Sequence, residues 1–132
     1  MLGRKTFTRD ELDAGRAATT AQLDALDQLP KTKADAQAEL AAAIVLAMDR
    51  RYVHRVRATS GKDGNPLNEV ELIAEAFLDH GGVFTTNNVI KHVPEKTVLH
   101  LADGDRVRLT PADARTLADA FYVELETRFV EA

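Results

Sequence analysis

The spacing of apolar residues along the chain predicts four helices. In the first, over residues 9–28, the positions expected to face the core are spaced by seven, four and three residues, at Leu12, Thr19, Leu23 and Leu26. Thr8 and Glu11 have the spacing of a capping box at its start, and Pro30 follows its end. The pattern also predicts helices over 33–57, over 65–80 and from Thr110 to Phe129.

Capping residues mark the starts of these later helices. Asn65 precedes Pro66, and Thr110 precedes Pro111; in both pairs a polar cap is followed by a proline, which is favoured at the first helical position. Thr32 is the expected cap of the helix over 33–57.

The centre of the second helix, residues 40–48, is apolar on every side. A helix with this pattern must be covered all round, and three other helices with a small sheet do not obviously enclose it. We therefore expect a second copy of the chain to cover part of it, in a two-fold homodimer.

Between the third and fourth helices the apolar period changes to two, with β-branched residues over 89–93, 97–101 and 106–110. Asp103-Gly104 is a typical hairpin turn. The sequence thus predicts an α+β fold, mainly α: four helices with a small antiparallel β-meander between the third and fourth. No linker divides it, so residues 1–132 form a single predicted domain.

Composition narrows the function classes. The chain of 132 residues has a net charge of −4 and no cysteine, which excludes a disulfide scaffold, a thiolate metal site and a cysteine nucleophile. The N-terminus has no apolar run of signal-peptide length, and the apolar stretch over 40–48 is shorter than the about 20 residues that span a membrane. We expect a cytoplasmic protein with no membrane segment.

The basic residues concentrate in one segment, which holds Arg50, Arg51, His54, Arg55 and Arg57 beside Tyr52. Such a cluster could bind a phosphate, an acidic partner or nucleic acid. Alternatively, cations near a helix C-terminus complement the helix dipole and pair with acids of the same chain. The structural alternative is favoured, because acids outnumber bases over 63–132 and general nucleic-acid affinity rewards a continuous positive face.

A second candidate lies in the loop before the third helix, where Lys62, Asn65 and Asn68 surround a glycine-rich turn that could receive an anion. Turn and capping chemistry explains these residues except Asn68. The histidines show no metal-binding spacing; only His92 and His100, with Glu95, could meet across the meander, and we expect no metal site. No catalytic motif and no cofactor fingerprint is present.

Two stretches carry a resemblance to known sequences: 61–70, and 104–110 followed by the helix over 121–126. They resemble a group of small uncharacterised bacterial proteins, some loosely labelled plasmid-related. The resemblance covers about residues 4–130. It implies a bacterial, intracellular, single-domain protein, and no activity, cofactor or site residue.

Three function classes remain. The first is a non-enzymatic interaction or structural protein acting as a homo-oligomer, favoured by the apolar centre of the second helix and the missing catalytic pattern; its protein partner, if any, is not identified by the sequence. The second is a nucleic-acid-associated factor using residues 50–57. The third is a small-ligand-binding protein or an enzyme, which needs a pocket that the sequence does not reveal.

Overall fold

The helices of the computed structural model begin at the residues that cap them. The structure describes residues 6–57 and 59–130, so the ends of the predicted 1–132 domain lie outside the described residues. Helix α1 (Arg9–Asp27) starts after Thr8, whose hydroxyl accepts from the Glu11 amide while the Glu11 carboxylate accepts from the Thr8 amide. This first helix and its capping box are confirmed.

The last two long helices also start as predicted. Helix α4 (Pro66–Asp79) follows Asn65, whose side-chain oxygen accepts from the backbone N–H groups of Leu67 and Asn68. Helix α5 (Pro111–Arg128) follows Thr110, which forms a capping box with Asp113.

The predicted helix over 33–57 changes its winding part-way. Helix α2 (Ala34–Met48) continues into a π-helical segment, η1 (Asp49–Val53), and then into the short α3 (His54–Val56). The N-cap position of α2 is Lys33 and makes no side-chain cap bond, so the prediction that Thr32 caps this helix is wrong.

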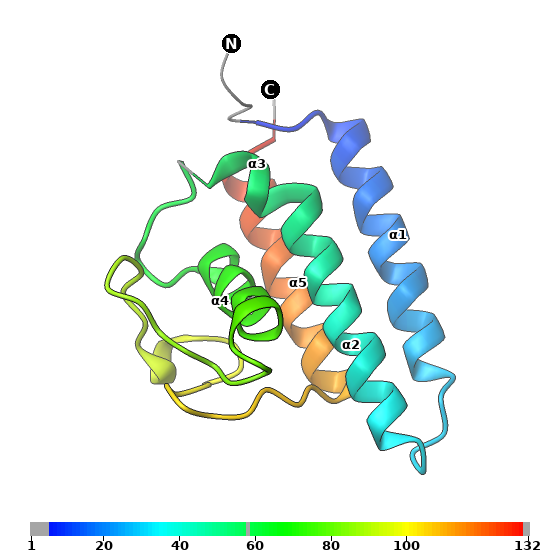
Figure 1. Cartoon of the computed structure of the whole chain (residues 1–132). Helices are drawn as coiled ribbons and strands as arrows, with labels where there is room; N and C mark the ends of the chain where they lie inside the picture. The colour runs from blue at the N-terminus through cyan, green and yellow to red at the C-terminus, as the bar shows by residue number, and fades with distance from the viewer. Residues whose placement is uncertain (1–5, 58, 131–132) are drawn as a thin grey trace.

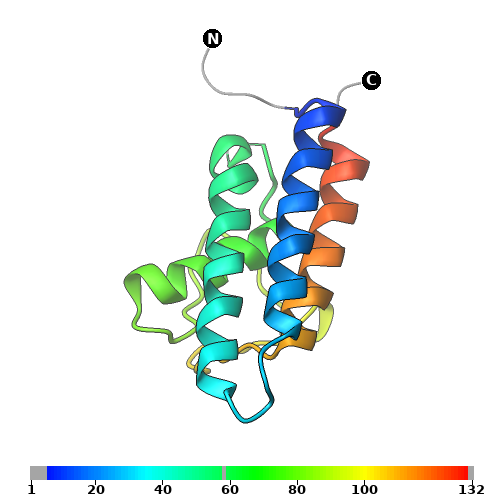
Figure 2. The same cartoon turned by 90° about the vertical axis from the view of Figure 1, so that its right-hand side faces the viewer.

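Three long helices lie side by side, with α1 antiparallel to both α2 and α5 (Figure 1, Figure 2). The shorter α4 crosses them and packs against α2 and α5, on the side away from α1. One hydrophobic cluster joins all four, with Phe7, Leu26, Ile44, Ile73 and Phe121 among its most buried members.

The apolar centre of α2 is mostly covered within one chain. Ala41, Ile44, Val45 and Met48 are buried, and α1, α4 and α5 all contact this helix. Of residues 40–48 only Ala43 is exposed, while the others on that side are partly buried. The apolar pattern of residues 40–48, which led us to expect a homodimer, is therefore explained by the packing of α4 across α2. The dimer itself stays a prediction.

The predicted β-meander is wrong: the described residues form no sheet, and the fold is mainly helical rather than α+β. Only one isolated bridge, between Val83 and Arg106, lies in this region, which also holds the 3-10 turn η2 (Pro94–Lys96). The reason is that side chains take the backbone donors that a ladder would need. The Glu69 carboxylate accepts from the Val98 and Leu99 amides at 2.9 Å each, and Asn87 accepts from Val89 and Ile90.

Helix α4 is more deeply buried than its pattern predicts. Its Leu67–Ala74 run and Ala76 are all buried, including the polar side chains of Asn68, Glu69 and Glu71, whereas Leu78 is 66% exposed. The apolar spacing predicts a core stripe that includes Leu78 and a solvent face of Glu69, Glu71, Glu75 and Asp79. This prediction is wrong for Glu69 and Glu71, which are buried, and for Leu78, which is exposed.

Candidate functional site

A cleft of about 470 Å³ lies between α4 and the segment that joins α2 to α3. We call it the Asp49 cleft. It is lined on the α2–α3 side by Leu46, Asp49, Arg50, His54 and Arg57, and on the α4 side by Glu71, Ala74, Glu75, Leu78 and Asp79. The cleft thus combines an apolar wall with charged groups of both signs.

The π-helical winding of η1 helps to place these side chains together. Asp49 and His54 are five residues apart, and in a regular α-helix such a pair would be rotated by about 140° around the axis. In η1 the His54 amide donates to the Asp49 carbonyl, five residues back, and both side chains reach the cleft.

Two carboxylate oxygens of the cleft lack hydrogen-bond donors. Asp49 Oδ1 and Glu71 Oε1 are both buried and accept no hydrogen bond from any residue that the structure describes. The Glu71 side chain is only 6% exposed; its Oε1 lies 3.4 Å from Arg57 Nε, close enough for an ion pair but without hydrogen-bond alignment. Buried oxygens in this state are costly, because nothing replaces the water they have lost.

Burial also shifts the titration of two of these acids. It raises the pKa of Asp49 above its ordinary value, against the opposing effect of the Arg57 guanidinium. It likewise raises the pKa of Glu75, with a further contribution from the neighbouring Glu71 carboxylate. Four acids face two arginines and one histidine in this cleft, so its charge is negative when the acids are ionised.

The predicted basic segment is divided between two sides of the helix. His54 and Arg57 line the Asp49 cleft, Arg51 and Arg55 face α1, and Arg50 reaches both sides. Arg55 pairs with Glu11 at 2.9 Å and lies over the Phe7 ring, and Arg51 donates to the Thr19 hydroxyl at 3.1 Å. Arg50 forms no hydrogen bond or ion pair with any residue in the described ranges.

The loop with Lys62, Asn65 and Asn68 is occupied by its own hydrogen bonds. The Asn65 side chain takes the first α4 amides, and its amide group donates to Ser60 O at 2.7 Å. The buried Asn68 donates to Gly61 O and accepts from Gly64 N, each at 3.0 Å. The Lys62 carbonyl accepts from the Lys91 amide. Asn68, which turn and capping chemistry did not explain, therefore holds the loop over 61–64 in place by hydrogen bonds at both of its ends.

The two meander histidines bind the backbone. His92 Nε2 lies 2.6 Å from the Leu101 carbonyl, and His100 Nδ1 lies 2.9 Å from the Pro94 carbonyl. Within the described part of the chain, no group of three or more histidines and carboxylates is arranged to hold a metal ion.

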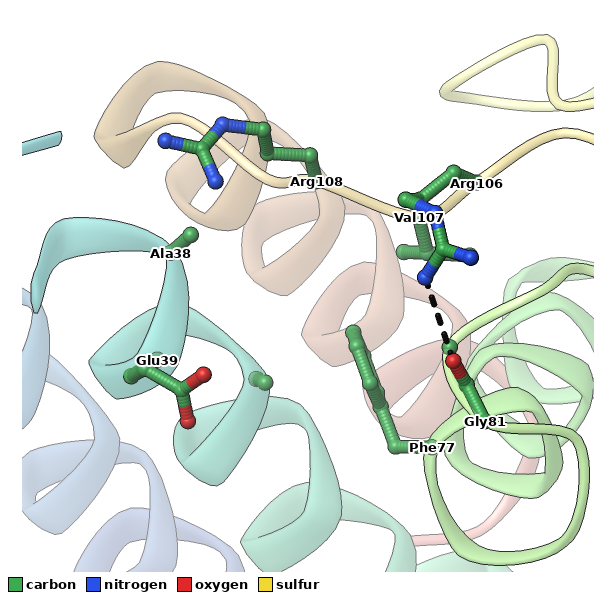
Figure 3. Close-up of a pocket in the computed structure, with 9 residues that line it drawn as sticks. Ala38, Glu39, Phe77, Gly81, Arg106, Val107 and Arg108 are labelled. Atoms are coloured by element: carbon green, nitrogen blue, oxygen red, sulfur yellow. Dashed lines mark hydrogen bonds between the residues drawn. The ribbon is translucent and has the colours of Figure 1, made fainter. Parts of the chain in front are cut away.

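A second hollow, of about 300 Å³, lies between α2, the end of α4 and residues 106–108 (Figure 3). Phe77 stands between Glu39 on one side and Arg106 on the other. The Arg106 guanidinium donates to Gly81 O and Arg108 pairs with Asp35, and all three charged lining residues are exposed. Since its arginines already have partners and none is buried, this hollow is the weaker candidate.

The residues that sequence reasoning missed are the acids Asp49, Glu71 and Glu75. The only signal was the spacing of Glu71 and Glu75, one helical turn apart, but that spacing is common on solvent-facing helices. Their burial depends on how α4 crosses α2, which the local pattern does not contain.

Comparison with known proteins adds no family to this picture: no family model, no curated protein and no solved structure matches the chain. Among the described helices, none has both the length and the apolar character needed to cross a membrane.

Proposed function

We propose that this protein is a binding protein whose Asp49 cleft takes an organic cation, an ammonium or guanidinium group on a short apolar stem. The observation that carries the proposal is the pair of buried carboxylate oxygens, Asp49 Oδ1 and Glu71 Oε1, that line one cleft and accept no hydrogen bond. An N–H donor with a positive charge supplies what both oxygens lack.

The shape of the cleft supports a stem of a few carbons. Leu46, Ala74 and Leu78 form its apolar lining, and Leu78 is largely exposed at the rim, where a ligand would cover it. Arg50 and Arg57 attract anions, but the four acids of the cleft outnumber these two arginines. The cleft as a whole therefore favours a cation. This function belongs to the small-ligand class of the sequence analysis.

Calorimetric titration of the whole protein with butylguanidinium and butylammonium tests the proposal, with butyrate as the anionic counterpart of equal stem. We expect saturable binding of at least one cation and none of butyrate. Glu71→Gln or Asp49→Asn should weaken binding by about tenfold, which corresponds to one charge-assisted hydrogen bond.

The matched control is Asp119→Asn, which removes one carboxylate from the exposed face of α5. It should leave the affinity unchanged, because its charge is screened by solvent. Equal loss in Asp119→Asn and Asp49→Asn would mean that only net charge matters, and would contradict a site at the Asp49 cleft.

A further inference from the structure

A separate groove lies on the other side of η1, between this segment and α1. It has a volume of about 440 Å³ and is lined by Glu11, Ala14, Gly15, Arg50, Arg51, Tyr52 and Arg55. Figure 1 shows α1 and α4 on opposite sides of α2; α1 contributes to the lining of this groove, and α4 to that of the Asp49 cleft. Of the groove residues, only Arg50 also lines the cleft.

The charge of the groove is positive, in contrast to the cleft. Its one acid, Glu11, is engaged by Arg55 at 2.9 Å and by the α1 cap at Thr8. Glu11 therefore does not neutralise the guanidinium groups of Arg50 and Arg51. Arg51 uses one N–H on the Thr19 hydroxyl, and Arg50 makes no hydrogen bond or ion pair with a residue that the structure describes. Most of their donors are therefore available to a ligand.

The floor of the groove is apolar. Ala14 and the Tyr52 ring contribute carbon, and Gly15 contributes no side chain. Tyr52 is 2% exposed, and its hydroxyl lies beneath the α1 backbone at Gly15, so the ring and not the hydroxyl faces the groove.

We propose that this groove binds the phosphate group of a small phosphate monoester. The adjacent Arg50 and Arg51 present planar donors suited to phosphate oxygens, and the apolar floor suits the carbon part of the ester. A phosphate offers more acceptor oxygens to two guanidinium groups than a carboxylate does. Duplex nucleic acid is disfavoured because it needs a positive surface that continues beyond the groove. The arginines of α1 that could continue it, Arg9 and Arg16, are both paired with Glu126.

Butyl phosphate is the probe for this site. Calorimetry on the whole protein at constant ionic strength should show saturable binding of butyl phosphate, weaker binding of inorganic phosphate, and still weaker binding of butyrate. The chain has two tyrosines and no tryptophan, so in Tyr122→Phe the emission comes from Tyr52 alone. We expect butyl phosphate, but not an equal concentration of sodium chloride, to change that emission.

Arg50→Gln is the decisive variant, because the exposed Arg50 supports no described contact and its loss should not affect folding. We expect about tenfold weaker butyl phosphate binding in Arg50→Gln and in Arg51→Gln. Arg106→Gln, a charge-matched change at the far hollow, and Glu75→Gln, in the Asp49 cleft, should both leave the affinity within about twofold. The last control separates failure of this site from failure of the cation cleft.

Three results would overturn the inference. One is the absence of saturable butyl phosphate binding at about 10 mM, where even a millimolar site would be filled. Another is an equal affinity loss in Arg50→Gln and Arg106→Gln, which would indicate charge alone. The third is retention of duplex DNA without any binding of butyl phosphate, which would assign these arginines to a nucleic-acid interface.

Discussion

At Gly15 the backbone of α1 passes directly over the Tyr52 hydroxyl. An ideal Cβ at this position would overlap that oxygen, and it would lie 2.7 Å from Tyr52 Cζ. From sequence, Gly15 is expected only to weaken the helix slightly. The structure gives it a packing role: glycine lets α1 approach η1 closely enough to bury the Tyr52 ring.

Gly15→Ala should therefore destabilise the protein. In an ordinary helix interior this change gains up to about 1 kcal/mol, but the clash with Tyr52 should turn it into a net loss of about 1–3 kcal/mol. Urea denaturation measures the change. The same substitution in a Tyr52→Phe background should cost less, since the overlapping oxygen is gone; a stabilised Gly15→Ala would show that the two helices separate freely.

Apolar residues recur at helical spacing along α5 and predict a core stripe, and all of its members are buried: Leu117, Ala118, Phe121, Leu125 and Phe129. Phe121 is central in this stripe. Its side chain is fully buried, with the Tyr52 and Tyr122 ring centres at 5.9 Å and 5.5 Å. Phe121→Ala should lower the free energy of unfolding by about 3–5 kcal/mol. Tyr122, which the stripe omits, is also buried, and its hydroxyl lies 2.7 Å from Thr19 Oγ1. Tyr122→Ala should therefore be similarly costly, and a denaturation midpoint unchanged in both would contradict this packing.

Among the elements, those decided by neighbouring residues are predictable and those decided by distant ones are not. Caps at Thr8, Asn65 and Thr110 act within three residues, so the sequence places the starts of α1, α4 and α5 correctly. The segment over 89–110 has strand-like composition, but its Val98 and Leu99 amides donate to Glu69, about 30 residues earlier, and its Lys91 amide donates to the Lys62 carbonyl. The acids of the Asp49 cleft escaped prediction for the same reason.

Glu69 is the side chain that holds this long segment on α4. Glu69→Gln keeps the shape but replaces one acceptor oxygen by a donor, so one of the Val98 and Leu99 amides loses its partner. We expect a loss of about 1.5–3 kcal/mol, as for hydrogen bonds to charged groups. Amide hydrogen exchange should accelerate at Val98 and Leu99 more than within α1; uniform acceleration would indicate a general loss of stability instead.

The fold of the whole molecule bears on whether a single chain can bury the apolar residues 40–48 or needs a second copy to do so. The sequence predicts that a second copy covers part of residues 40–48, but Val45 in this stretch is 1% exposed and lies in the core of a single chain. Val45→Glu should therefore unfold the protein at every concentration rather than separate a dimer. Circular dichroism together with light scattering distinguishes these outcomes; a folded monomeric Val45→Glu would return the residue to an interface.

The Asp49 cleft should make stability depend on pH. Burial raises the pKa of Asp49 in the folded state, so folding favours the protonated acid. Stability is then greatest below the ordinary pKa of the group and falls as pH rises through the raised value, with Arg57, His54 and Arg50 opposing and Glu71 reinforcing the shift.

Asp49→Asn removes this dependence. Relative to the unmodified protein, its free energy of unfolding should increase as the pH rises from about 4, the ordinary pKa of an aspartate, through the raised pKa of Asp49, because the cost of the buried charge is gone. Urea denaturation across this range, with Asp119→Asn as control, measures the difference. A variant that becomes relatively less stable as pH rises would mean that the ionised Asp49 stabilises the fold. Cation binding should weaken over the same interval on acidification.

The π-helical segment over 49–53 sets the direction in which the residues after it, in α3, point around the helix axis. A π turn contains about one residue more than an α turn, so the chain after Val53 is rotated as if one residue had been inserted. Removing one residue within 49–53 would allow α2, η1 and α3 to form one regular α-helix and would rotate the residues after the deletion back. Arg57 would then swing away from Glu71 and Arg55 away from Glu11, so the Asp49 cleft and the groove beside α1 would each lose one arginine through a single deletion.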